Sequence, residues 1–328
     1  MGARDQGRQD HGGIAAATMS GLNTHHRPAM ANLMCMMSML VWAVGLPAAD
    51  LLIGPVPPLQ LTAARMAMAT VCLLPIWWWL EGGAVLRGAN WGRGLWIGGI
   101  SIGLGAFMLV VGQGLTDSVT VAVISAAMPV MGIAIEVLLD GKKITASVVV
   151  GTLLSLAGGL MALGGVTGGA GLGLGALLCF CAVLLFTVGS RLTVTAFPQL
   201  TALGRTTVTL TGAALATGVA AALGLLLGAA GPDWAVLGLK EFGALALFSI
   251  GGLAISQLLW IASIGSIGIA LASLHINATP FYVMIILFVM GGEWRWLQAL
   301  AAAIVGLGVL VAQGLIPLRR NRSHPGHP

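Results

Sequence analysis

Charge is the scarcest property of this 328-residue sequence. Only 8% of its residues are Asp, Glu, Lys or Arg, whereas 58% are hydrophobic, and the mean hydropathy is +0.98. Soluble domains carry about 25% charged and about 45–50% apolar residues, so this chain has too few polar side chains to cover a soluble globule. The composition therefore predicts a polytopic protein embedded in a lipid bilayer. The basic residues are scattered over short segments, which argues against a nucleic-acid partner.

Cysteine is also rare, and its four copies all fall inside apolar stretches. No His or carboxylate accompanies them at the spacing of a metal site, so we expect packing cysteines, no metal and no cofactor. The sequence has no GxxxxGK[ST] phosphate-binding loop and no HExxH zinc motif. It also lacks the two mid-depth aspartates of an intramembrane aspartyl protease. We therefore expect neither an ATP-driven pump nor an enzyme.

Long apolar stretches make up most of the chain instead. Each is close to the ~20 residues that a helix needs to cross a hydrocarbon core. Polar tails at residues 1–28 and 319–328 flank them, and the short connections leave no room for a soluble domain. The expected fold is an all-α bundle of ten transmembrane helices, at residues 29–53, 58–80, 95–115, 118–139, 143–164, 171–193, 200–228, 240–262, 266–290 and 294–317.

The basic residues determine the expected orientation of this bundle, because Lys and Arg are retained on the cytoplasmic side. One side carries Arg4, Arg8, Arg27, Arg87, Arg93, Lys142, Lys143, Arg191, Arg319, Arg320 and Arg322. The other side carries only Lys240 and Arg295. We therefore expect a multi-pass protein of the inner (plasma) membrane with both termini in the cytoplasm.

The two halves of the chain resemble each other. Leu33–Gly45 runs parallel to Leu177–Gly189 at a constant spacing of 144 residues, and Gln-Leu-Thr-Ala occurs at both Gln60 and Gln199. Five such matches in all, including these two, occur in the same order along the two halves. Because each half has five expected spans, an odd number, the second half enters the membrane from the opposite face. The sequence thus predicts an inverted repeat of residues 29–165 and 171–318, the architecture of alternating-access transporters.

The sequence also resembles a known family, the drug/metabolite transporter superfamily and in particular its EamA-type members. The resemblance extends over nearly all of residues 29–318. It is carried by the glycine-rich fifth and tenth spans and by Trp42-Ala43, Arg65, Arg205, Pro129 and Pro280. It implies ten spans in two five-helix repeats and a secondary transporter, most similar to the amino-acid exporters.

Polar and aromatic residues near mid-depth are the candidate substrate-binding residues. These are Trp42, Ser125, Phe180, His275, Asn277 and Tyr282, with Gln113, Gln257 and Trp260 nearer the gates. Each has a structural alternative: His275 and Asn277, for example, can tie helices together. Arg65 and Arg205 are either structural or anion-binding, and Pro129 and Pro280 break their helices and serve gating.

Such a site suits a neutral or zwitterionic cargo. Its expected composition is apolar and aromatic with a few hydrogen-bonding groups, which fits amino acids with apolar or aromatic side chains. Phosphorylated dianions would need several cations at mid-depth, and the sequence offers two off-centre arginines. Amines, drugs and sugar derivatives remain alternative cargoes, as does a non-transporting scaffold or receptor. The sequence is compatible with a monomer or a homodimer.

Overall fold

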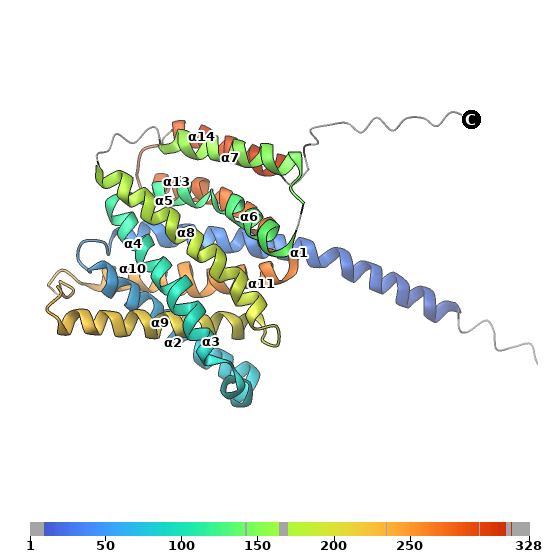
Figure 1. Ribbon diagram of the computed structural model, residues 1–328, viewed down its shortest axis with the longest axis horizontal. Coiled ribbons are helices and arrows are strands. Elements are labelled where there is room, and N and C mark those ends of the chain that lie inside the picture. Colours follow the sequence, from blue (N-terminus) through green and yellow to red (C-terminus); the bar gives the residue numbers. More distant parts are fainter. Residues whose placement is uncertain are drawn as a thin grey trace, which may run out of the picture.

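A computed structural model gives an all-helical bundle, drawn in Figure 1. It describes residues 10–141, 143–163, 170–233, 235–294, 296–312 and 316. The first half of the chain forms α1 (Asp10–Asp50), α2 (Pro58–Gly88), α3 (Trp91–Trp96), η1 (Ile97–Leu104), α4 (Gly105–Leu115), α5 (Ser118–Ser125), α6 (Met128–Asp140) and α7 (Ala146–Leu163). Helix α1 thus begins within the polar segment that we expected to precede the first span.

The second half of the chain continues the all-helical pattern. It forms α8 (Ala170–Ala196), α9 (Ala202–Leu226), α10 (Leu239–Ala246), η2 (Leu247–Ile255), α11 (Ser256–Ile267), α12 (Ile269–Ser273), η3 (Leu274–Ala278), α13 (Thr279–Val289) and α14 (Trp296–Ala312). Several ends follow from local chemistry. Pro58 opens α2, where its missing N–H costs nothing. Asp117 and Thr201 cap α5 and α9, and Gly141 ends α6 at φ 65°.

Four of the expected spans contain an interruption of regular α-helix. The third and eighth spans contain the π-helical segments η1 and η2. The fourth span breaks at Ala126 and Ala127, between α5 and α6, and the ninth passes through the 3-10 segment η3. The interruptions thus fall in corresponding spans of the two halves.

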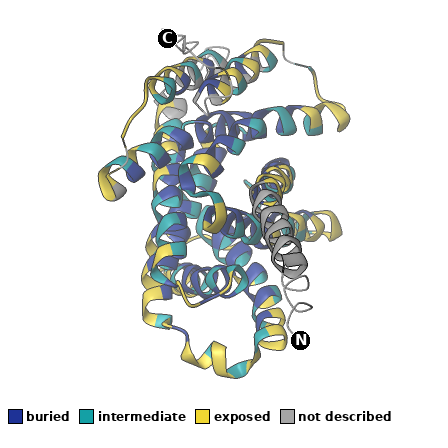
Figure 2. Cartoon of the chain, turned by 90° about the vertical axis from the view of Figure 1, so that its right-hand side faces the viewer, coloured by how far each residue is buried: buried dark blue, intermediate teal, exposed yellow. Residues whose placement is uncertain are grey.

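Corresponding helices also pack in corresponding ways. Helix α2 packs on α9, α7 on α14, α6 on α12 and α5 on α13. Helix α1 packs on η2 and α11, and α8 likewise packs on η1 and α4. In Figure 1, α7 and α14 lie along one edge of the bundle and α2 and α9 along the opposite edge. Figure 2 shows the buried residues in the interior of this bundle and exposed residues around it.

Eight helical segments of the described chain are long and apolar enough to cross a membrane. They coincide with eight of the ten expected spans. Helices α7 and α14 are the exceptions, with 18 and 17 residues. At 1.5 Å per residue they measure about 27 and 26 Å, slightly less than the hydrocarbon core. That these two also cross the membrane stays a prediction.

Small residues allow two pairs of helices to approach closely. A Cβ atom at Gly45 of α1 would lie 3.0 Å from the Cα atom of Gly252 in η2. A Cβ atom at Gly189 of α8 would lie 2.5 Å from the Cβ atom of Ser101 in η1. Gly45 and Gly189 are equivalent positions of the sequence repeat. Such contacts between small residues are typical of membrane helices, which gain stability by close packing.

Candidate functional site

A cavity lies between the two halves of the bundle and is lined by both. The centre of a water-sized sphere can move through about 70 Å³ of it. Its lining residues are Ser38, Met39, Trp42, Arg65, Met66, Ile102, Gly105, Ala106, Leu109, Ser125, Met128, Ala182, Val183, Phe186, Gly252, Leu253, Ser256, Gln257, Trp260 and Ile276. They come from seven of the expected spans, namely the first four and the sixth, eighth and ninth, and so include the broken fourth and ninth spans.

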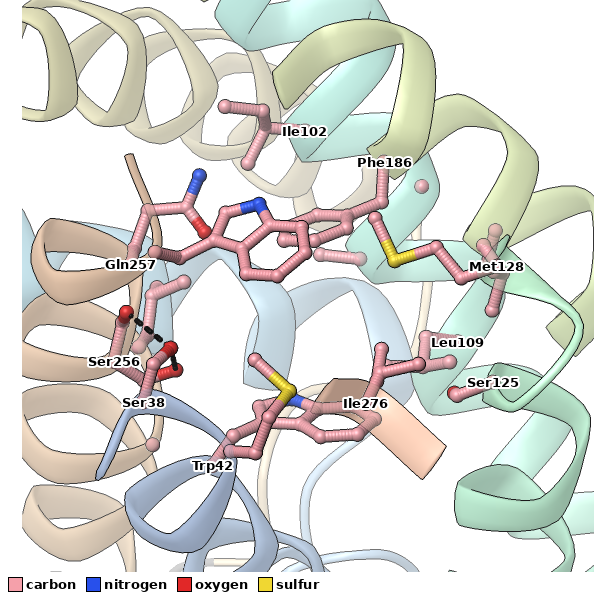
Figure 3. A pocket seen from close by; sticks show the side chains of 18 of the residues that line it. Ser38, Trp42, Ile102, Leu109, Ser125, Met128, Phe186, Ser256, Gln257 and Ile276 are labelled. Atoms are coloured by element: carbon pink, nitrogen blue, oxygen red, sulfur yellow. Dashed lines mark hydrogen bonds between the residues drawn. The ribbon is translucent and has the colours of Figure 1, made fainter. Parts of the chain in front are cut away.

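Aromatic side chains form a large part of the cavity wall. Phe186 of α8 stacks on Trp260 of α11, with ring centroids 6.2 Å apart and an interplanar angle of 27°. The indole N–H of Trp260 donates to Oγ of Ser190 at 2.9 Å, which fixes the orientation of its ring. Trp42 of α1 lies across the cavity from Phe186 (Figure 3). A flat apolar group can therefore contact ring surfaces on opposite sides.

Three of the polar side chains gather on one wall of the cavity, whereas Ser125 lies on the other side with Leu109 (Figure 3). Figure 3 shows Ser38, Ser256 and Gln257 on one side and Leu109 and Met128 on the other. Oγ of Ser38 donates to the carbonyl of Ser256 at 2.7 Å, so this hydroxyl is already bonded. Gln257 is only 3% exposed, and its Nε2 atom has no hydrogen-bond partner. A buried amide donor without a partner is unusual and costly, which marks Gln257 as a group that a ligand would satisfy.

Arg65 adds a positive charge to the same cavity. Its side chain is 3% exposed and leaves α2 toward η2. Nε donates to the carbonyl of Phe248 at 3.3 Å, and one terminal nitrogen donates to the carbonyl of Gly252 at 3.2 Å. The guanidinium carbon lies 3.7 Å from the centroid of the Phe248 ring, a cation–π contact. A π-helical segment disturbs the regular ladder of carbonyls, and Arg65 bonds two carbonyls of such a segment.

Arg205, the counterpart of Arg65 in the second half, has different surroundings. It is part-buried, and its Nε and a terminal nitrogen donate to the carbonyls of Phe197 and Pro198 at 2.8 and 3.1 Å. These two residues connect α8 to α9, so Arg205 fastens a turn. The structure thus gives the two arginines different positions, and only Arg65 lines the cavity.

Four candidate residues from the sequence meet at the cavity, namely Trp42, Ser125, Gln257 and Trp260. Oγ of Ser125 donates to the carbonyl of Val121, one turn earlier, at 2.8 Å. The remaining five candidates do not line the cavity: Gln113, Phe180, His275, Asn277 and Tyr282.

The surroundings of these five differ from one another. Gln113 donates to the carbonyl of Leu46 at 2.9 Å and to Oδ1 of Asp50 at 2.8 Å, so it ties α4 to the end of α1. Phe180 is 45% exposed on α8. His275 has Nδ1 3.3 Å from the carbonyl of Ala272 within its own span. Tyr282 packs against two clusters of buried hydrophobic residues, one that includes Met128 and one that includes Val121. Asn277 is 2% exposed and its amide atoms have no partner.

Pro129 and Pro280 follow the interruptions of their spans. They stand in the first turns of α6 and α13, the helices that begin after each break. Proline is well tolerated there because the first N–H groups of a helix have no partner within the helix. The two prolines therefore restart helices, and neither lines the cavity.

Several lining residues were not predicted from the sequence, and Phe186 is the most informative of them. It occupies the position equivalent to Trp42, at the spacing of 144 residues that relates the first spans of the two halves. Because Trp42 was a candidate, the repeat spacing alone would have predicted Phe186 as a lining residue. Ser38 and Ser256 gave no such signal, because isolated serines are common in membrane helices.

Comparison with known proteins agrees with this architecture. The family model of the EamA-like transporter family matches residues 29–164. A crystal structure of another protein superposes on this chain with a TM-score of 0.68 at 24% sequence identity. The superposition covers 88% of this chain and 97% of that chain, and it supports the fold. No curated protein matches the sequence. Over residues 29–164 the sequence is thus similar to the EamA-like transporter family.

Proposed function

We propose that this chain is a secondary transporter that moves small neutral or zwitterionic metabolites, above all amino acids with apolar or aromatic side chains, across the inner membrane. The direction that fits the resemblance is export. The observation that carries the proposal is the cavity between the two halves, with its aromatic rings and its few polar groups. Pockets of this composition suit small organic ligands.

Alternating access between two inverted repeats is the mechanism we propose. Its support comes from features that recur in both halves: the π-helical segments η1 and η2, the interruptions before Pro129 and Pro280, and the close approaches at Gly45 and Gly189. In an inverted-repeat carrier the cargo binds between equivalent helices and the repeats rock around it. If the two halves are inverted repeats, interruptions and close contacts of this kind should occur in pairs, one in each half.

The lining of the cavity also supports a repeat relation between the two halves of the chain. Sixteen of its twenty residues form pairs at two spacings of the repeat, the 144 residues between the first spans of the two halves and the 151 residues between Pro129 and Pro280. Three pairs are 144 residues apart, for example Trp42 and Phe186, and five are 151 residues apart, for example Leu109 and Trp260. A cavity with paired walls can be closed on either side by equivalent movements. It therefore suits a carrier better than a receptor or a scaffold.

The lining also discriminates among cargo classes. Apolar and aromatic side chains dominate it, which favours a cargo with an apolar or aromatic group. One arginine is its only cationic residue, too few for a phosphorylated dianion. Its twenty residues include no carboxylate, the group that would pair with the cation of an amine. Neutral amino acids fit this balance better than amines or sugar phosphates.

Counterflow tests the proposed function. We expect purified protein in liposomes that are loaded with unlabelled phenylalanine to accumulate labelled phenylalanine transiently. Protein-free liposomes supply the baseline, and a sugar phosphate supplies a cargo that should give no counterflow. Preferred exchange of the sugar phosphate, or no exchange of any apolar amino acid, would contradict the proposal.

Reporter fusions test the expected orientation. A reporter that is active only in the cytoplasm should be active when fused after Gly141, the residue that ends α6. The same reporter should be inactive after Pro232, in the connection between α9 and α10. The reason is the excess of basic residues on the side that includes Gly141. Activity after Pro232 would rule out the proposed orientation.

A further inference from the structure

Arg65 is a buried cation without an acidic partner among the residues that the structure describes. Its contacts are two backbone carbonyls and the ring of Phe248. A guanidinium group has five N–H donors in a planar fork, and the two bonds to carbonyls use two of them. A buried charge is expensive when it is not paired. Arg65 therefore keeps both charge and donors available at the wall of the cavity.

Gln257 supplies a further unused donor beside the same wall. It follows Gly252, whose carbonyl accepts from Arg65, by five residues along η2 and α11. That separation corresponds to about 7.5 Å along a helix axis, within the combined reach of the two long side chains. Nε2 of Gln257 is buried without a partner. The nearby hydroxyl of Ser38 already donates to a carbonyl.

The structure thus places unused donors of Arg65 and Gln257 near each other, and they accompany a positive charge. A carboxylate complements such a set, because it is an anion that accepts hydrogen bonds at both oxygens. An ammonium group finds no anionic partner there, since no carboxylate lines the cavity. The opposite wall and the aromatic rings complement an apolar group.

We propose that Arg65, with Gln257, is the carboxylate-binding subsite of the cavity, and that the transporter recognises apolar monocarboxylates through this group without requiring an amino group. The inference rests on the proposed function for the location of the cargo, and it deepens the substrate class. Amino acids bind through the carboxylate, with the side chain against Trp42, Phe186 and Trp260. Amino-free acids of the same shape are substrates as well.

Three compounds separate the contributions of the two charged groups: phenylalanine, 3-phenylpropionate, which lacks the amino group, and phenethylamine, which lacks the carboxylate. They are tested as competitors of labelled phenylalanine in counterflow. In the wild type, 3-phenylpropionate should compete within about threefold of phenylalanine. Phenethylamine should compete at least about tenfold more weakly, because it loses its interaction with Arg65. Competition by phenethylamine as strong as that by 3-phenylpropionate would overturn the inference.

Variants locate the effect at one side chain. Arg65→Gln should weaken competition by 3-phenylpropionate at least about tenfold, and Arg65→Lys should retain part of it because it keeps the charge. Arg205→Gln is the matched control, since it removes an equivalent arginine that fastens a turn outside the cavity. It should leave the ratio of acid to amine competition unchanged. An equal change of this ratio in Arg205→Gln would overturn the assignment to Arg65.

A binding measurement separates this inference from the proposed function. 3-Phenylpropionate should raise the thermal unfolding temperature of the purified wild type but not that of Arg65→Gln. Stabilisation without any counterflow would contradict transport and support the subsite. Counterflow of phenylalanine without stabilisation or competition by 3-phenylpropionate would support transport and overturn the subsite. The Arg65→Lys variant keeps the test valid if Arg65→Gln fails to fold.

Discussion

Replacing Trp42 by alanine is expected to lower phenylalanine counterflow at least about tenfold, equivalent to about 1.4 kcal/mol. Trp42 lines the cavity from α1 and lies across it from Phe186. The substitution removes a large ring surface from the wall of the cavity that lies opposite Phe186. Contacts between aromatic rings contribute about 0.5–1.5 kcal/mol beyond the burial of their surface. Trp42→Phe should restore most of the flux.

Phe180→Ala is the matched control for this substitution. Phe180 is also an aromatic residue of a membrane-spanning helix, but it is 45% exposed and does not line the cavity. Its removal should change the flux by less than about twofold, within the range of exposed substitutions. Equal losses in Trp42→Ala and Phe180→Ala, or an unchanged flux in Trp42→Ala, would argue against the cavity as the route of the cargo.

A second large effect is expected at Gly98, where η1 crosses α9. A Cβ atom at this position would lie 1.9 Å from the carbonyl oxygen of Thr209 and 2.8 Å from the nitrogen of Ala213. Both are backbone atoms, which cannot move aside as the end of a side chain can. Gly98→Ala should therefore force the two helices apart and lower the free energy of unfolding by about 1–3 kcal/mol or more. The unfolding temperature in detergent measures this effect.

Gly218 provides the control for the loss of a glycine. It lies in α9, and a Cβ atom there would meet nothing within 4 Å. Alanine also favours helix relative to glycine by up to about 1 kcal/mol. Gly218→Ala should therefore leave the unfolding temperature unchanged or raise it. Equal unfolding temperatures for Gly98→Ala and the wild type would show that η1 and α9 do not approach as closely as described.

The helices themselves could be predicted well from the sequence, because apolar length is a strong signal in membrane proteins. The expected spans at residues 58–80 and 118–139 correspond to α2 and to α5 with α6, for example. The π-helical and 3-10 segments could not be predicted. A continuous apolar stretch has the same composition whether its backbone is regular or interrupted, so hydropathy contains no signal for η1, η2 or η3.

The site was less predictable than the fold. Arg65 and Arg205 occupy equivalent places in the sequence, and nothing in their local sequence distinguishes a cavity arginine from one that fastens a turn. The difference comes from which carbonyls are within reach, those of η2 for Arg65 and those of residues 197 and 198 for Arg205. Such neighbours are set by tertiary packing. The position of Phe180 within its expected span likewise predicted that it lies near the middle of the membrane. It did not indicate whether the ring faces the cavity or the outside of the bundle.

The close approaches at Gly45 and Gly189 have a mechanical consequence. Helices that touch near their backbones can rotate about the contact but cannot come closer, so each contact acts as a fulcrum. Gly45 follows Trp42 by three residues, and Gly189 follows Phe186 by three residues. Because α1 and α8 run in opposite directions (Figure 1), the two fulcra lie toward opposite ends of the cavity. In the alternating access that we propose, rocking about one of them would widen the end of the cavity that holds the other, which would give the carrier two strokes.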